Sequence, residues 1–274
     1  MSDAVAHADK HAHVHHRALQ HHFDTMSQQK EAAVIGMWVF LLTEILFFGG
    51  LFVAYMIYRI WYFDAFAEAS RSLSLFWGGL NTAVLIGSSL TMAMAVRGAQ
   101  TNKRQATVSW LILTMILGCV FLGVKVIEYS DKFEHHHVPG PNFVWASEHA
   151  APTSAEATAG RPAAEGAAEH PSTSLGAGAT APEAAAGHRK LSLTPDQLQR
   201  TTQIYFSLYF TMTGLHALHM IIGIGLMSVI TWMAWKGRFD EEYYTPVELS
   251  GLYWHFVDIV WIYLFPLLYL IDRS

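Results

Sequence analysis

Charged residues are scarce in this sequence. Aspartate, glutamate, lysine and arginine make up 14% of its 274 residues, whereas a soluble globular domain carries about 25%. Lysine and arginine form no long run and the formal net charge is −5, which excludes a basic surface for nucleic acid. The single cysteine, Cys119, excludes a disulfide framework or a two-cysteine metal site within these residues. With 52% hydrophobic residues, the composition is that of a membrane protein.

Five segments are long and apolar enough to cross a bilayer, whose ~30 Å hydrocarbon core takes roughly 20 helical residues. Tryptophan and tyrosine gather near their ends, as they do in the aromatic belts at the headgroup level. The predicted fold class is therefore all-α, an integral membrane bundle of five transmembrane helices. The predicted spans are Ala33–Tyr58, Phe76–Val96, Val108–Ile127, Ile204–Trp232 and Leu252–Ile271.

Composition divides the chain into four parts. Residues 1–30 form a polar, histidine-rich tail, and residues 31–130 hold the first three predicted spans. Residues 131–200 form a long loop rich in alanine, glycine and proline. This loop has too few apolar side chains to offset the entropy of ordering, so we expect it to be mostly disordered. Residues 201–274 hold the last two spans.

A helix start is visible close to the end of the long loop. Thr194 is followed by Pro195, a pair that suits an N-cap and the first position of a helix. We therefore predict a short interfacial helix over residues 192–203 that leads into the fourth span.

Positive charge predicts the orientation in the membrane. Five spans place the two termini on opposite sides, and short cytoplasmic loops carry an excess of lysine and arginine. The loops after the second and fourth spans together hold more of this charge than the loop after the first. The former contain Arg97, Lys103, Arg104, Lys236 and Arg238, and the latter contains Arg59 and Arg71. We expect a cytoplasmic N-terminus, with the long loop and the C-terminus on the exterior.

Glu44 lies near the middle of the first predicted span, in GMWVFLLTEILFFGG, with no basic residue one turn away. An ionisable residue at the bilayer centre costs several kcal/mol and marks a functional-site candidate. The sequence leaves three states open. The carboxyl group is protonated, pairs with a group on another helix, or touches a water-filled path.

Three histidines also fall within predicted spans. His216 and His219 share one face of the fourth span because they are three residues apart, and His255 begins the fifth span, three residues before Asp258. Histidines on two membrane helices are compatible with haem or copper ligation, and their depths do not exclude it. We favour hydrogen bonds between helices, the commoner role of such histidines. For the histidines of the tail and of the long loop, we expect only weak or adventitious metal binding.

Two further polar features lie in the spans. Lys125 and Glu128 are spaced i, i+3, which predicts an ion pair near the exterior end of the third span, with a lysine able to snorkel. Asn81 belongs to a small, polar side of the second span that suits close helix packing. For all three residues we expect a structural role.

Five stretches, in order, resemble one family. GMWVFLLTEILFFGGLF at 36–52, LNTAVLIGSSLT at 80–91 and FLGVKVIEY at 121–129 resemble the third, fourth and fifth helices of seven-helix cytochrome c oxidase subunit III. TGLHALHMIIG at 213–223 and YWHFVDIVWIYLF at 253–265 resemble its last two. The chain is similar to the five-helix form of the haem–copper oxidase subunit III family, which lacks the first two helices.

The resemblance implies a non-catalytic subunit of a proton-pumping terminal oxidase in a bacterial inner membrane, with cytochrome c favoured over quinol as donor. Haems and copper would belong to subunits I and II, and none to this chain. It would pack against subunit I, hold phospholipid, support proton uptake and meet cytochrome c only through the complex. Glu44 matches the family's buried carboxylate, a candidate for proton uptake or the lipid cleft. The matching positions that imply structural contacts between helices are His216, His219, His255 and Asp258.

Two other functions compete with this one. A stand-alone b-type cytochrome or metal carrier would use His216, His219 and His255, and a subunit III-like protein associated with nitric oxide reductase would share the motifs. A transporter or proton channel around Glu44 has no support from broken helices or an inverted repeat.

Overall fold

The computed structural model describes residues 18–134, 194–240 and 242–271. Within these ranges the chain forms six helices and no strand. All of them except α2 are long and apolar enough to cross a membrane, which confirms the predicted all-α bundle of five spans. The helices are α1 (Met26–Trp61), α2 (Phe63–Arg71), α3 (Leu75–Gln100), α4 (Arg104–Glu134), α5 (Pro195–Trp235) and α6 (Thr245–Tyr269).

A helix begins at Pro195 after the predicted N-cap Thr194, but it is not separate from the fourth span. The Thr194 side chain accepts a hydrogen bond from the Gln197 backbone, and the Gln197 side chain accepts one from the Thr194 backbone, which forms a capping box. From there α5 continues unbroken for 41 residues. The prediction of a short, separate helix over residues 192–203 is therefore wrong, because no glycine or proline lies between Pro195 and Ile204 to interrupt the helix. The long loop at 135–193 and most of the histidine-rich tail lie outside the described residues.

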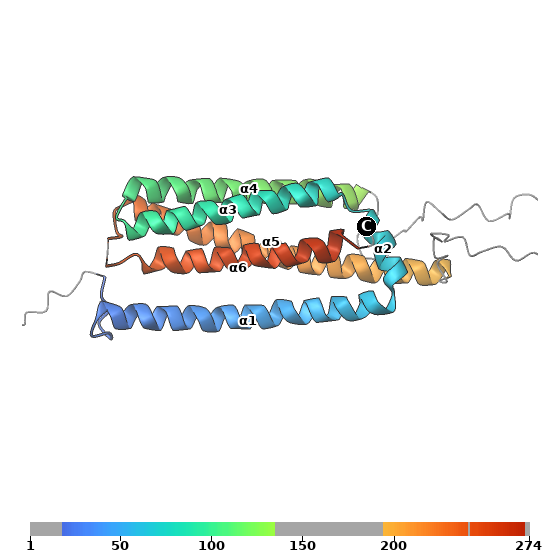
Figure 1. The fold of residues 1–274 in the computed structure, drawn as a ribbon, viewed down its shortest axis with the longest axis horizontal. Coiled ribbons are helices and arrows are strands. Elements are labelled where there is room, and N and C mark those ends of the chain that lie inside the picture. Colours follow the sequence, from blue (N-terminus) through green and yellow to red (C-terminus); the bar gives the residue numbers. More distant parts are fainter. Residues whose placement is uncertain (1–17, 135–193, 241, 272–274) are drawn as a thin grey trace, which may run out of the picture.

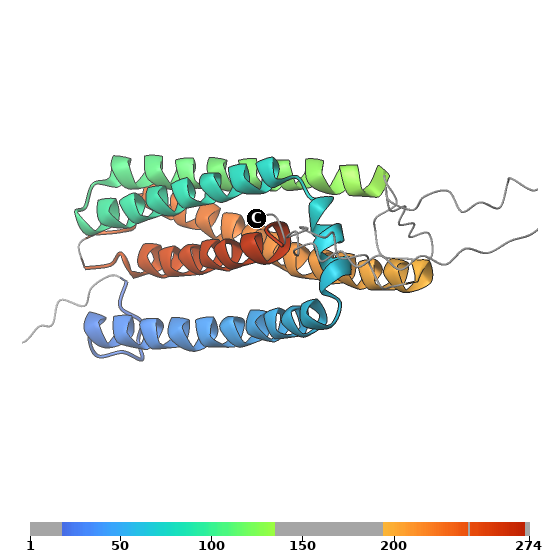
Figure 2. The ribbon, with the colours of Figure 1, turned by 45° about the vertical axis from the view of Figure 1, so that its right-hand side comes forward.

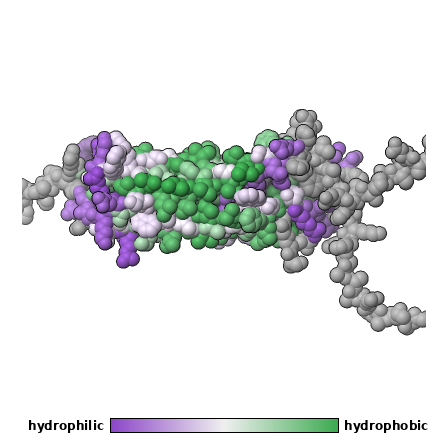
Figure 3. Space-filling model, turned by 90° about the horizontal axis from the view of Figure 1, so that it is seen from above, coloured by the Kyte–Doolittle hydropathy of each residue, from purple (hydrophilic) through white to green (hydrophobic). Residues whose placement is uncertain are grey.

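Four of the membrane-spanning helices form a bundle, and α1 lies beside it. Figure 1 shows α3, α4, α5 and α6 running side by side, with α1 along one flank next to α6 and α2 across one end. The turned view in Figure 2 keeps α1 apart from α3 and α4. Seen from above, a band of hydrophobic surface lies between two hydrophilic ends (Figure 3). This surface suits a lipid bilayer.

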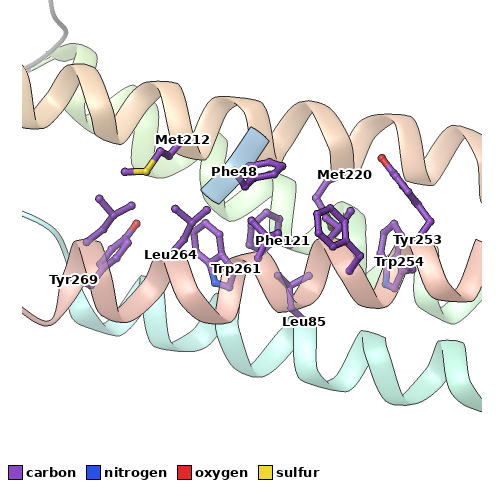
Figure 4. Packing of buried hydrophobic residues seen from close by; sticks show 14 of the residues in the cluster. Phe48, Leu85, Phe121, Met212, Met220, Tyr253, Trp254, Trp261, Leu264 and Tyr269 are labelled. Atoms are coloured by element: carbon purple, nitrogen blue, oxygen red, sulfur yellow. The ribbon is translucent and has the colours of Figure 1, made fainter. Parts of the chain in front are cut away.

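Trp254 of α6 is the centre of the bundle. Its indole N–H donates to Ser88 Oγ of α3 at 2.7 Å. A Cβ atom on Gly118 of α4 would stand 2.9 Å from the Trp254 ring, and one on Gly223 of α5 would stand 3.0 Å from it. Both glycines are needed for this close approach, since any side chain there would displace the ring. Figure 4 shows Trp254 in a row of buried side chains with Trp261 and Phe121.

The contact between α1 and the bundle is a narrow seam. Its buried residues are Leu41, Phe48 and Tyr55, seven residues apart and therefore on one face. The rest of α1 is largely exposed, and only 11% of its most apolar window is buried, compared with 56% for α6. The bundle thus folds around large buried side chains, whereas α1 is held along one line.

The end of α6 shows how α1 and α2 are fixed at the far side of the membrane. The last carbonyls of a helix have no partner in the helix itself. Here the Leu268 carbonyl accepts hydrogen bonds from Ser70 Oγ of α2 and Tyr205 Oη of α5, both at 2.8 Å. The Tyr55 hydroxyl of α1 donates to the Leu267 carbonyl. Side chains from three helices therefore cap α6.

Candidate functional site

Glu44 lies on the seam, midway along α1. Its position between Leu41 and Phe48 places the carboxyl group against the bundle and not toward the surroundings. Oε2 lies 3.1 Å from Nε2 of His219 on α5, and the two side chains are 19% and 14% exposed. Of the three states left open by the sequence, the structure shows pairing with another helix. This contact is the polar bridge between α1 and α5.

The hydrogen bond of the other ring nitrogen of His219, Nδ1, limits the protonation states that the Glu44–His219 pair can adopt. Nδ1 lies 2.8 Å from the Leu215 carbonyl oxygen, which can only accept, so Nδ1 carries a hydrogen. In a neutral imidazole Nε2 is then an acceptor, and Glu44 must donate from a protonated carboxyl group. In an imidazolium, Nε2–H donates to a carboxylate instead. Either way the pair shares one proton and has no net charge, which suits its depth in the membrane.

Aromatic groups surround this pair. The Phe48 ring packs edge-on against the His219 ring, with centroids 5.3 Å apart. The Tyr253 hydroxyl donates to the His219 carbonyl at 2.9 Å, and the Tyr253 ring is in contact with Phe40 of α1. These contacts fix the imidazole between α1, α5 and α6.

A second polar cluster is centred on Lys125 of α4. Nζ donates to Glu128 Oε2 and to the Tyr269 hydroxyl, each at 2.8 Å, and Tyr269 itself donates to Glu128 Oε1. The Trp261 ring centroid lies 4.6 Å from Nζ, close enough for a cation–π interaction. The i, i+3 contact is present, but the lysine does not snorkel, because only 3% of it is exposed.

His216 and Asn81 are buried without hydrogen bonds. His216 lies between the rings of Phe121 and Trp261, whose centroids are 5.5 and 5.2 Å from its own. Neither of its nitrogens, nor the side-chain amide of Asn81, has a hydrogen-bond partner among the described residues. The hydrogen bonds between helices that the sequence predicts for these two residues are not seen in the part of the chain that the structure describes. For His216 the reason is that aromatic rings enclose the imidazole.

His255 and Asp258 lie on the α6 face that meets α3. Nδ1 of His255 is 2.7 Å from Ser89 Oγ, a contact between the two helices. Asp258 is 2% exposed, and Ser89 is near enough to interact with it electrostatically. Neither carboxyl oxygen, however, has a hydrogen-bond partner of good geometry in the described part of the chain.

The described residues do not gather a metal-binding set. No group of three or more histidine, cysteine, aspartate or glutamate side chains is close enough to hold an ion within residues 18–134, 194–240 and 242–271. Both nitrogens of His219 are already in hydrogen bonds. The histidines of α5 and α6 therefore meet glutamate, serine and aromatic rings.

Comparison with known proteins agrees with the order of the motifs. The family model described as cytochrome c oxidase subunit III matches residues 195–272, which include α5 and α6. Cytochrome c oxidase subunit 3 of Thermostichus vulcanus is 26% identical over 251 residues, covering 91% of this chain and 92% of that protein. The family model and this relative confirm the resemblance to the haem–copper oxidase subunit III family that the motifs predict.

Other members of the family come from different oxidases. The subunit 3 of cytochrome bo(3) ubiquinol oxidase from Pseudomonas aeruginosa is 25% identical over 86% of this chain and 84% of its own. Cytochrome c oxidase subunit 3 of Corynebacterium diphtheriae is 26% identical over 87% of both. As a subunit III, the chain is a multi-pass membrane protein and part of a multi-subunit oxidoreductase complex.

Some residues that build these sites carry no signal in the sequence. Tyr269 completes the Lys125 cluster from the end of α6, 144 residues away. Ser89 has the small size that suggests helix packing, but its hydroxyl bonds to His255. Tyrosine near the end of a span is read as an interfacial belt, so only the side-chain contact across the bundle with Lys125 of α4 identifies Tyr269 as a buried partner.

Proposed function

We propose that this chain is the non-catalytic subunit III of a proton-pumping terminal oxidase that transfers electrons from cytochrome c to oxygen, with no redox centre of its own. The observation that carries the proposal is the state of the α5 histidines. His219 uses both ring nitrogens in hydrogen bonds, and His216 is enclosed by Phe121 and Trp261. Haems and copper then lie in partner subunits I and II.

The proposed partners follow from the family and the surface. Subunit I is the main neighbour, and cytochrome c is reached only through the complex. The named relatives include a ubiquinol oxidase subunit, so the donor is decided elsewhere in the complex. Phospholipid is the proposed ligand of the exposed flanks of α1, which are apolar over most of their length. Nucleic acid is no partner.

The proposed location is a bacterial inner (cytoplasmic) membrane with the N-terminus in the cytoplasm. The end of the bundle where α1 begins also holds the α3–α4 and α5–α6 connections (Figure 1). These short connections carry more lysine and arginine than the segment around α2, the distribution expected of a cytoplasmic side.

The proposed role of Glu44 is to support proton uptake and durable turnover in the partner subunit by holding α1 against α5. The Glu44–His219 pair shares one proton, so it joins two helices without a net charge. Both side chains are partly exposed at the seam, where a bound lipid would cover them. Among the remaining polar residues, His255 joins α6 to α3, and Lys125 and Glu128 join α4 to α6 through Tyr269.

A purification through a tag on this chain, in mild detergent, tests the proposed function. Mass spectrometry should find a large haem-binding subunit and a copper-binding subunit, and the reduced-minus-oxidised spectrum should be that of an oxidase. A chain that purifies alone and carries its own b-type haem would overturn the proposal and support the stand-alone cytochrome. Copurification with a nitric oxide reductase would support the third function.

A further inference from the structure

A groove of about 480 Å³ opens between α3 and α6. Its apolar rim consists of Ile86 and Leu90 of α3 and Ile259 and Ile262 of α6, all four at least 44% exposed. None of its lining residues comes from α1, α4 or α5. The groove is therefore a feature of the outer surface, separate from the Glu44 seam.

The lining of this groove includes three polar side chains. Ser89 Oγ lies 2.7 Å from Nδ1 of His255. The partly exposed His255 makes no hydrogen bond through Nε2 to any residue in the described ranges. Neither oxygen of the buried Asp258 has a hydrogen-bond partner of good geometry there, although Ser89 is near enough to interact with this carboxyl group. Ser89 and Asp258 each lie midway along their helix, so the polar groups are close to the bilayer centre.

Lipid alone does not satisfy these groups. An acyl chain neither donates nor accepts hydrogen bonds, and headgroups lie about 15 Å from the centre of a ~30 Å hydrocarbon core. A polar group left unpaired in that core costs several kcal/mol. Ionisable residues at this depth almost always face protein or a water-filled cavity. The occupant of the groove must therefore bring a hydrogen-bonding group to mid-membrane depth.

The outer face of α1 provides the contrast. Its exposed residues at similar depth are Leu42, Leu46 and Val53, together with Thr43. The Thr43 hydroxyl donates to the Phe40 carbonyl of its own helix at 2.7 Å, so no polar group there needs a partner. That face suits lipid, whereas the α3–α6 groove does not.

We propose that the α3–α6 groove seats a transmembrane helix of a neighbouring oxidase subunit, whose hydrogen-bonding side chain meets His255 at mid-membrane depth. Ser89 acts as a positioning residue for the imidazole. The apolar rim packs against the partner helix on both sides of this contact. The inference rests on the proposed function, because it requires a membrane-embedded partner subunit, and it adds the face that this partner covers.

Photo-crosslinking within the assembled complex tests the docking face. A photoreactive phenylalanine analogue replaces Leu90 or Ile262 in the groove, and Leu46 or Val53 on α1 as matched controls. The groove positions should give adducts with a membrane-embedded oxidase subunit, and the control positions should give lipid adducts. Oxidase subunits that copurify but crosslink only from α1, or an adduct between two copies of this chain, would overturn the docking face. Absence of every oxidase subunit from the purification would instead overturn the proposed function.

Substitution of His255 tests the polar contact. His255→Phe keeps a ring but removes both nitrogens, whereas His255→Gln keeps a donor and an acceptor. With about 0.6–1.7 kcal/mol per interhelical hydrogen bond, the Phe variant should be lost from the complex about three- to twentyfold more readily as detergent is raised. The Gln variant should restore most of the retention. Equal retention of the Phe variant and the wild type would exclude the proposed contact, and the crosslinks report on docking even where a variant folds poorly.

Discussion

The four-helix bundle and α1 cross the same membrane but are held in different ways. In α3–α6, glycines at 118 and 223 admit the Trp254 ring between three helices, and a buried ion pair on α4 is hydrogen-bonded to Tyr269 at the end of α6. Along α1, three large buried residues and a few polar contacts, among them the Glu44–His219 pair, provide the attachment. The bundle is specified by its own packing, whereas α1 depends on a line of contacts and on its surroundings.

The difference has a physical cause. Lipid tails are as apolar as leucine, so helices in a membrane associate through close packing and hydrogen bonds and not through hydrophobic burial. Gly36 and Gly50 of α1 have no atom within 4 Å of where a Cβ would be, so these glycines bring no helix close. Polar contacts such as Glu44–His219 and Tyr55–Leu267 therefore have a larger share in fixing α1 than any one contact has in the bundle.

The largest effect is expected from breaking the Lys125 pair. Lys125→Met leaves Glu128 buried without its cation, and removal of one partner of a buried pair costs about 3–5 kcal/mol. The double variant Lys125→Met/Glu128→Leu removes both charges and should recover most of that loss. Thermal unfolding of the purified protein in detergent measures the loss of stability in the single variant and its recovery in the double variant. Equal losses in the single and double variants would contradict a buried, paired charge.

A smaller loss is expected from filling the space beside Trp254. Gly118→Val places side-chain atoms within contact of that ring, and overpacking a well-packed core costs about 1–3 kcal/mol. Gly50→Val on α1 is the matched control, since it meets nothing within 4 Å. The same unfolding assay should show a loss for Gly118→Val alone. A comparable loss for both variants would remove the contrast between the bundle and α1.

Glu44 variants should have a modest effect that separates α1 from the bundle. Glu44→Leu removes the contact with His219, with an expected loss of about 0.6–1.7 kcal/mol. In Glu44→Gln, the amide N–H can still donate to Nε2, so assembly should stay nearly intact and only turnover durability or proton uptake should change slightly. Repeated-turnover oxygen consumption measures this. Loss of the oxidase haems in Glu44→Gln would be inconsistent with the proposed role.

The smallest effect is expected where α1 begins, at the Lys30 end of the contact between α1 and α6. Lys30 Nζ of α1 lies 3.0 Å from Glu248 Oε2 of α6, and the side chains are 37% and 30% exposed. Solvent screens such a pair, so Lys30→Ala should cost only about 0.2–1 kcal/mol. The loss should shrink further at high salt. A salt-independent loss above that range would mean that this end of α1 is held more firmly than the seam at Glu44.

The sequence predicts the spans well because hydrophobicity over some 20 residues is a strong signal. The α5 start at Thr194 was predictable for the same kind of reason, since a cap depends on neighbouring residues. The start of α6 at Thr245 lies seven residues before the predicted Leu252, because the first turns of that helix are polar and amphipathic. Helix α2 was missed because its nine residues fall below the length of a span.

The site was harder to predict because it depends on which faces meet. Glu44 stands out by its charge, but its partner is 175 residues away. The Lys125–Glu128 contact follows from spacing, whereas its burial follows from Tyr269 and Trp261 on another helix. Sequence spacing predicts contacts within one helix. Contacts between helices require the packing itself.

The proposal that this chain has no redox centre is tested most directly by haem content. The reduced-minus-oxidised spectrum of the complex is measured per mole of the large subunit, before and after this subunit is removed with detergent. We predict the same haem content in both samples and a colourless isolated chain. Loss of a b-type haem from the complex, recovered with the isolated chain, would contradict the accessory role and place a haem on its histidines.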